Sequence, residues 1–149
     1  MAIPGHLPGA GRYFVTSVTS SRRRLFQVAA NAELLLLETL QAYRRQGHYK
    51  LHAFVVMPDH IHLLLTPQGE TIERVMGFIK GGSSHRLASK RPVWQRGFSD
   101  HRIRDAEDFR TRRAYIHQNP VRAGMVDLPE SYPFSSAYRA ETGEPYLGG

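Results

Sequence analysis

Residues 49–66 read YKLHAFVVMPDHIHLLLT. Two runs rich in aliphatic and aromatic residues, 49–57 and 60–66, are separated only by Pro58 and Asp59, a typical turn pair. The pattern predicts an antiparallel β-hairpin. Side chains two positions apart on a strand face the same way, so His60 and His62 should point to one side of the sheet.

The sequence before the hairpin predicts one strand and one helix. Residues 12–19 are β-prone, with Tyr13 and Val15 on one side and Phe14 and Thr16 on the other. Residues 29–46 are rich in Ala, Leu and Glu with helical spacing, and Gly47 offers a stop.

The sequence after the hairpin predicts two helices around a short strand. Residues 71–80 have helical spacing and are followed by a break or kink at Gly81–Ser84. Residues 101–104 read as a strand, and 105–118 as a helix that Pro120 ends. The first six elements predict an α+β fold of the ferredoxin-like β-α-β-β-α-β type, an antiparallel sheet covered by helices, with a C-terminal helix after it.

Composition narrows the class of protein. The 149 residues suit a single domain, with a loose leader at 1–11 and a tail at 139–149. Without Cys there is no disulfide and no thiolate metal site. The apolar runs are far shorter than the roughly twenty residues that span a bilayer, and the first residues lack the apolar segment of a secretory signal. We therefore expect a cytoplasmic protein.

The charge points to a polyanionic partner. The formal net charge is +7, and residues 74–122 carry twelve basic and four acidic side chains, whereas residues 123–149 are net acidic. Arg dominates the basic residues, and its planar guanidinium suits phosphate groups. A solvated basic surface is the alternative, so charge alone does not establish nucleic-acid binding.

Two motifs carry candidate chemistry. His60 and His62 can present two imidazoles to one metal ion, although two ordinary polar-face residues would give the same spacing. On the last predicted helix, Arg112, Tyr115 and Asn119 share a face. A phenol can attack phosphorus to form a covalent intermediate, and the Asn119 amide oxygen can supply a third metal ligand. The alternative is that Tyr115 packs at the helix edge and Asn119 caps the helix.

The motifs MPDHIHLLL, FIKGGSSHR, VWQRGFSDHRIRDAEDF, YIHQNPVRAGMV and YPFSS occur in this order between about Tyr13 and Ala137. In this combination the chain resembles the tyrosine (Y1, HUH) transposases of the insertion-sequence 200 and 605 type, and more closely the repeat-associated tyrosine transposases. The resemblance implies Tyr115 as the nucleophile and His60, His62 and Asn119 as metal ligands. The metal implied is Mg²⁺ or Mn²⁺, and a His-rich site suits Mn²⁺ at least as well as Mg²⁺.

The resemblance also implies a substrate: single-stranded DNA cut and rejoined near a hairpin through a 5′-phosphotyrosine, in a protein that acts as a monomer or a homodimer. Basic residues are then expected to contact the DNA, and Trp94 is a candidate platform for base stacking, with packing in the core as its alternative. This set of expected DNA contacts comprises Arg22, Arg23, Arg24, Lys80, Arg86, Lys90, Arg91, Trp94, Arg96 and Arg112. A non-catalytic hairpin-binding protein and a metal-dependent phosphoester hydrolase are the alternative functions.

Overall fold

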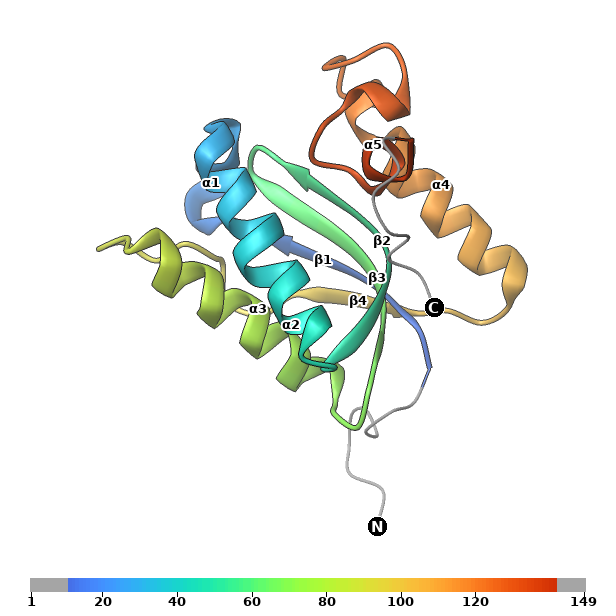
Figure 1. The fold of residues 1–149 in the computed structure, drawn as a ribbon, viewed down its shortest axis with the longest axis horizontal. Coiled ribbons are helices and arrows are strands. Elements are labelled where there is room, and N and C mark those ends of the chain that lie inside the picture. The colour runs from blue at the N-terminus through green and yellow to red at the C-terminus, as the bar shows by residue number, and fades with distance from the viewer. Residues whose placement is uncertain (1–10, 142–149) are drawn as a thin grey trace.

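A four-stranded antiparallel sheet forms the centre of the molecule in the computed structural model, which describes residues 11–141 (Figure 1). The leader and tail expected at the two ends lie largely outside this range. The strands are β1 (Tyr13–Val18), β2 (Tyr49–Met57), β3 (His60–Pro67) and β4 (Ser99–Arg102), in the spatial order β2-β3-β1-β4. This order and the helical connections confirm the predicted ferredoxin-like α+β fold.

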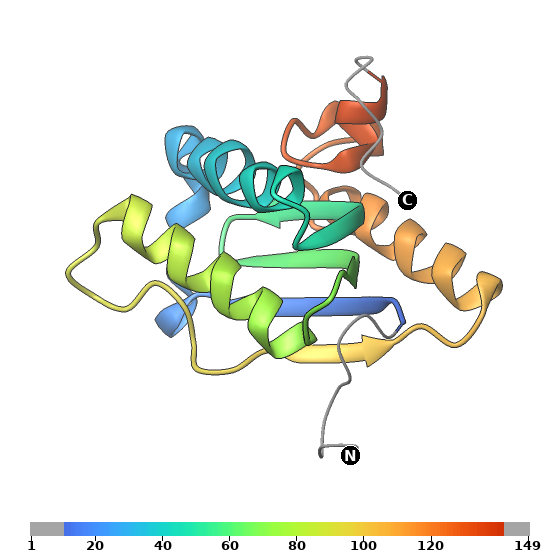
Figure 2. The same cartoon turned by 60° about the horizontal axis from the view of Figure 1, so that its bottom comes forward.

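Helices cover both faces of the sheet (Figure 2). One face is covered by the helical layer α1 (Ala29–Glu33), the π-helical segment η3 (Leu34–Leu40), α2 (Gln41–Arg45) and α3 (Ile72–Leu87). The other face carries α4 (Ala106–Arg122). Short elements complete the chain: η1 (Ser20–Arg22), η2 (Leu25–Gln27), η4 (Pro129–Ser131) and α5 (Ser136–Glu141). No helix within residues 11–141 combines the length and apolar character needed to cross a membrane.

The alternation of side chains divides the buried residues into two cores. Val15, Phe54 and Ile61 point to the face covered by α1 to α3, where Leu36 and Ile79 complete the larger core. On the opposite face, Ala53, Val55 and Leu64 pack against Ile116 of α4 and Tyr132. Thr16 of β1 and the two histidines of β3, His60 and His62, alternate with residues of the larger core and are therefore turned toward α4.

The second helix does not break at its glycines as the sequence predicted. α3 runs through Gly81 and Gly82 to Leu87, and it ends at Ala88 in the left-handed conformation. A Cβ on Gly82 would lie 2.7 Å from the Oη atom of Tyr43, so this glycine permits close packing of α3 against the neighbouring helical layer. Ser83 is buried and donates to the carbonyl of Ile79.

Two further boundaries differ from the prediction. β4 begins at Ser99 and ends at Arg102, because it pairs with β1 from Ser99 opposite Thr16 to Arg102 opposite Tyr13. α4 continues through Pro120 to Arg122, and the amide of Ala123 still donates to the carbonyl of Asn119. Pro120 removes one helical donor, but the ring is buried and the turn that follows is retained.

Candidate active site

His60 and His62 lie side by side at the start of β3 on the face covered by α4. Their ring centroids are 4.8 Å apart and the ring planes are 75° apart. His62 is 6% exposed and His60 is half-buried. The two imidazoles therefore converge, as the alternation along the strand predicted.

Each imidazole is held through its Nδ1 atom. Nδ1 of His60 lies 2.7 Å from Oδ1 of Asp59, and Nδ1 of His62 lies 2.8 Å from Oγ1 of Thr16, its partner on β1. With Nδ1 engaged in this way, Nε2 is the nitrogen suited to bind a metal ion. Metal-binding histidines commonly have this arrangement, in which a carboxylate or another polar group orients the ring from behind.

The environment keeps His62 uncharged. Burial lowers the pKa of His62 to about 3, with further contributions from the charges of His60 and Arg122. Burial alone would raise the pKa of the Asp59 carboxyl, but the hydrogen bond and charge of His60, together with Arg22, hold it below the usual value. His62 is thus available as a neutral nitrogen ligand at physiological pH.

α4 brings Tyr115 to this pair. The Tyr115 ring centroid lies 5.4 Å from that of His62 and 5.8 Å from that of Phe14, with an edge contact in each case. Phe14 in turn stacks on His62 at 5.3 Å. Tyr115 is 38% exposed, so substrate can reach it. Within one chain, the phenol therefore contacts the His62 imidazole, which in turn contacts His60.

Arg122 lies against the same tyrosine. Its guanidinium carbon is 4.2 Å from the centroid of the Tyr115 ring, one of the cation–π contacts of α4. Arg122 is exposed and it lowers the pKa of His62, which places its charge near the histidine pair as well. A negative group that approached Tyr115 would meet this guanidinium.

The donor set suits a divalent cation that keeps some of its water ligands. Within the described part of the chain, no three His, Asp or Glu side chains are grouped to hold a metal ion. A metal ion bound by the two Nε2 atoms would need a ligand of another type, and Asn119 lies one turn beyond Tyr115 on α4. Two imidazoles and one amide oxygen are compatible with Mn²⁺ or Mg²⁺.

A buried carboxylate fixes α4 against the sheet. Asp108 is 6% exposed, and its Oδ2 atom lies 2.8 Å from Nε2 of His101 on β4 and accepts from the amide of Arg104 at 3.0 Å. These interactions hold the pKa of Asp108 well below its usual value, and the hydrogen bond with His101 makes the largest contribution. Arg112, one turn on, approaches Asp108 at 3.5 Å and lies over the Phe14 ring. The network thereby sets the position from which Tyr115 projects.

Comparison with known proteins identifies this arrangement. The family described as "Transposase IS200 like" matches residues 10–119, a range that includes the histidine pair, Tyr115 and Asn119. The chain belongs to the IS200-like transposase family. The resemblance noted in the sequence is thereby confirmed, and the chain is an enzyme of the tyrosine transposase class.

Individual relatives agree with this membership. A REP-associated tyrosine transposase of Escherichia coli (strain K12) is 30% identical over 131 residues, covering 87% of this chain and 78% of that protein. A relative from Haemophilus influenzae, provisionally given the same name, is 29% identical over 154 residues, covering 91% of this chain and 85% of its own length. A solved structure of a REP-associated tyrosine transposase bound to a REP hairpin superposes with a TM-score of 0.79, at 27% identity, over 100% of this chain and 90% of that one.

Within this IS200-like transposase, Trp94 does not have the position expected of a base-stacking platform. It is 7% exposed, its ring packs against Phe26 at 5.4 Å, and its indole nitrogen donates to Oγ of Ser83 at 2.9 Å. The partner on α3 and the apolar contacts place Trp94 in the larger core, and the stacking prediction is wrong for this structure. Phe98 packs against the same core.

The basic residues of the transposase fall into two groups. Lys80 donates to the carbonyls of Gln95 and Gly97 at 2.9 and 2.5 Å, and Arg23 donates to the carbonyl of Pro92, so both hold the segment after α3 in place. Burial lowers the pKa of Lys80. Arg112, described above, is half-buried. The other basic residues expected to contact DNA are exposed to solvent, and they are Arg22, Arg24, Arg86, Lys90, Arg91 and Arg96.

Three residues of the transposase site were missed in the sequence. Asp59 was assigned only to the turn, although it directly precedes His60. Arg122 is seven residues after Tyr115, a spacing that places both on one helix face. The sequence predicts that the helix ends at Pro120, and this prediction leaves Arg122 outside the helix. Thr16 was assigned to the correct side of its strand, yet only the pairing of β1 with β3 shows that it faces His62.

Proposed function

We propose that this chain cuts and rejoins single-stranded DNA beside hairpins, with Tyr115 as the nucleophile. The observation that carries the proposal is the contact of the Tyr115 ring with His62, next to His60, within one chain. The hairpin as substrate is supported by the related structure, which is bound to a REP hairpin. The exposed basic residues supply the positive charge that such a ligand requires.

The chemistry conserves the energy of the phosphodiester bond. The Oη atom of Tyr115 attacks phosphorus, and the bond from phosphorus to the 3′ oxygen breaks. The 5′ phosphate stays on Tyr115, the 3′ oxygen leaves as a hydroxyl with a proton from water, and the phenol proton passes to solvent. Attack by a 3′ hydroxyl on the phosphotyrosine reverses these steps and joins the strands. No hydrolysis is required.

A divalent cation fits this site, with Nε2 of His60, Nε2 of His62 and the Asn119 amide oxygen as its protein ligands. When bound, Mn²⁺ or Mg²⁺ supplies positive charge that stabilises the phosphoryl oxygens and the developing phenolate. Asp59 and Thr16 orient the two imidazoles, and Phe14 holds the His62 ring from its face. These three residues act through the histidines and are positioning residues.

The direct test is a covalent trap. The full chain is mixed with Mn²⁺ and a set of hairpin oligonucleotides carrying flanking single strands, and the products are separated in SDS. We expect an SDS-resistant adduct of protein and DNA with at least one oligonucleotide, and mass spectrometry should locate the modification on the peptide that contains Tyr115. Absence of an adduct with every oligonucleotide and metal, despite hairpin binding, would support a non-catalytic binder instead.

Arg122 is expected to stabilise the charge that develops at the phosphate. Arg122→Gln should slow adduct formation by about 100-fold in single-turnover experiments, since loss of one well-placed donor to a transition state typically has an effect of this size. Arg122→Lys keeps the positive charge without the planar guanidinium, and its rate of adduct formation should lie between those of Arg122→Gln and the unmodified chain. A rate for Arg122→Gln equal to that of the unmodified chain would remove Arg122 from the site.

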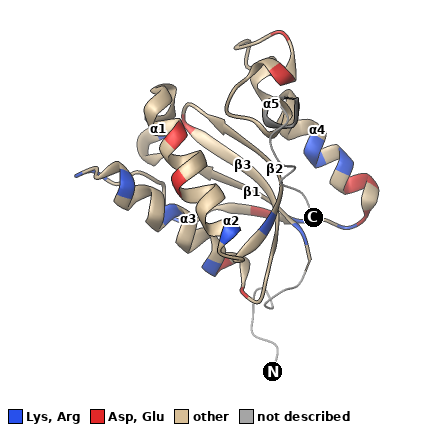
Figure 3. Ribbon diagram, viewed as in Figure 1, with Lys and Arg blue, Asp and Glu red and all other residues tan. Residues whose placement is uncertain are grey.

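The exposed basic surface should account for salt-dependent binding. Figure 3 shows Lys and Arg on α3 and along α4, whose first turn carries acidic residues. The helix that begins with α1 carries acidic residues and ends with basic ones in α2. Replacing Arg86 and Arg91 together by Ala should weaken hairpin binding and reduce the slope of log K against log salt by about 2, because each phosphate that a side chain neutralises adds roughly 0.9 to that slope. Arg45→Ala, at the exposed end of α2, is the matched control. An unchanged slope in the double variant would contradict the assignment.

A further inference from the structure

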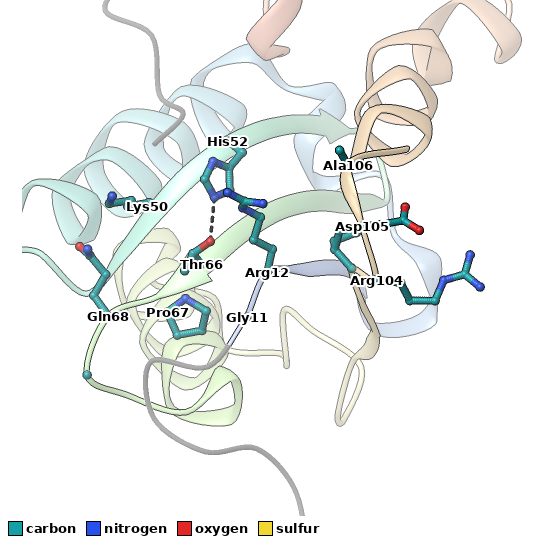
Figure 4. A pocket seen from close by; sticks show the side chains of 12 residues that line it. Gly11, Arg12, Lys50, His52, Thr66, Pro67, Gln68, Arg104, Asp105 and Ala106 are labelled. Atoms are coloured by element: carbon teal, nitrogen blue, oxygen red, sulfur yellow. Dashed lines mark hydrogen bonds between the residues drawn. The ribbon is translucent and has the colours of Figure 1, made fainter. Parts of the chain in front are cut away.

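A cavity lies on the same face of the sheet as the active site, toward the other end of β3. Its volume is about 710 Å³, and Thr66, His52 and Arg12 are among the residues that line it (Figure 4). Thr66 follows His62 by four positions and therefore faces the same side, at a distance of about 13 Å along the strand. The cavity is separate from the His60, His62 and Tyr115 cluster and takes no part in the chemistry above.

His52 lines this cavity from β2. Tyr49 and Leu51 lie in the larger core, so alternation along the strand turns His52 toward the α4 face, where its Nε2 atom lies 2.8 Å from Oγ1 of Thr66. The register shift between Leu51 and Ala53 then lets Ala53 face the same side. His52 is 3% exposed and its ring meets the Phe109 ring edge-on at 5.4 Å. Burial, with the nearby charges of Arg12 and Lys50, lowers the pKa of His52 to about 4. The histidine is thus a neutral, polar part of the wall.

Cationic groups lie beside this neutral wall. The Arg12 side chain extends alongside the His52 ring in Figure 4, and its guanidinium carbon lies 5.3 Å from the centroid of the Phe109 ring. Lys50 is exposed at the rim. Arg104 points away from the other labelled residues and approaches Asp108, while the Asp105 carboxylate accepts from the amide of Asp108. The cationic groups beside His52 are therefore Arg12 and Lys50, while the Asp105 carboxylate adds a negative charge among the lining residues.

We propose that this cavity binds one nucleotide of the DNA strand that is cut at Tyr115, with its phosphate at Arg12 and Lys50 and its base beside His52 and Thr66. The proposal rests on the proposed function above. Cavities of about 300–1,000 Å³ are typical for small ligands, so 710 Å³ accommodates a nucleotide. Cationic side chains position phosphates, and neutral polar and aromatic groups contact bases.

The position of the cavity favours a nucleotide of the bound strand over a free one. A strand that lies along the sheet from the active site covers about 13 Å within roughly four stacked nucleotides, and within fewer when it is extended. A free nucleotide has the same phosphate and base, so the two sources must be separated by experiment.

The test measures hairpin affinity by fluorescence anisotropy while a single-stranded extension is lengthened one nucleotide at a time, on the 5′ side in one series and on the 3′ side in the other. We expect the affinity to rise by about tenfold at one length in one series, when the extension first reaches the cavity. Arg12→Gln and Lys50→Gln should each remove most of this rise without changing binding of the hairpin alone. An abasic spacer at the decisive position should reduce the rise.

Two controls distinguish loss of a cavity contact from a general loss of charge or of folding. Arg45→Gln removes an exposed guanidinium outside the cavity and should retain the rise, and thermal unfolding of each variant should show an unchanged melting temperature. No rise with length, or a rise that survives Arg12→Gln, would overturn the proposal. Saturable binding of a deoxynucleoside monophosphate that needs Arg12, without any effect of strand length, would assign the cavity to a free nucleotide and also overturn it. Adduct formation at Tyr115, scored in the same samples, tests the proposed function independently.

Discussion

Tyr115→Phe is expected to abolish the covalent adduct and strand joining, with a fall in rate of about 10⁴-fold or more. The substitution removes only the attacking oxygen, and losses of this order are typical when an enzyme nucleophile is deleted. The ring contacts with Phe14, His62 and Arg122 do not involve the hydroxyl, so we expect the fold and hairpin affinity to be unchanged. SDS gels and single-turnover rates with a radiolabelled hairpin measure the effect.

Tyr43→Phe is the matched control for this result. Tyr43 lies on the opposite side of the sheet, where its ring stacks on Phe78, and we expect its variant to form the adduct at the normal rate. The outcomes also separate the two alternative functions. Cleavage that persists in Tyr115→Phe would indicate a hydrolase in which the phenol only positions the substrate, and binding without cleavage by the unmodified chain would indicate a binding protein.

His62→Ala is expected to remove the response to metal and to lower the rate of adduct formation by more than about 100-fold. Loss of groups that merely orient a metal ligand typically costs 10- to 100-fold, so loss of a ligand should cost more. Chelation of the metal in the unmodified chain should have the same effect, and added Mn²⁺ should reverse it. Single-turnover rates across a Mn²⁺ titration give both the rate and the apparent metal affinity.

His48→Gln controls for the loss of an imidazole. His48 is bound to Glu70 at 2.8 Å and packs on Phe78, away from the α4 face, and we expect its variant to keep the full metal response. His62 is buried, so the melting temperature and hairpin affinity of His62→Ala must be measured to show that the variant is folded. A folded His62→Ala protein with an undiminished response to Mn²⁺ would contradict the metal site.

The repeating geometry of strands and helices made the main elements and the cluster predictable. The strand period of two residues along 60–66 places both histidines on one face of the sheet. The helical period of 3.6 residues places Tyr115 and the buried Ile116 on different faces of the last helix. These rules are local and depend little on the rest of the fold. They also predicted the order of the first six elements, from which the ferredoxin-like arrangement follows.

Features that depend on distant parts of the chain could not be derived in this way. Gly82 looks like a helix break until the Tyr43 side chain is placed beside it, and Trp94 looks like a binding residue until Ser83 is found as its partner. The register shift at His52 leaves no recognisable signal in a run of apolar residues. Pro120 stays within α4 because the surrounding helix is packed, although proline usually ends a helix.

The segment that follows η4 has a consequence for self-association. β2 is an outer strand, but the carbonyl of Phe134 accepts from the amide of Val56 at 2.8 Å, and Oγ of Ser136 accepts from the amide of Phe54 at 3.1 Å. The Tyr132 hydroxyl donates to the carbonyl of Val56 at 2.6 Å. Another copy of the chain that added a strand to this margin would first have to displace residues 132–136. A second molecule that extended the sheet would therefore have to pair with β4, the other outer strand, which has only four residues.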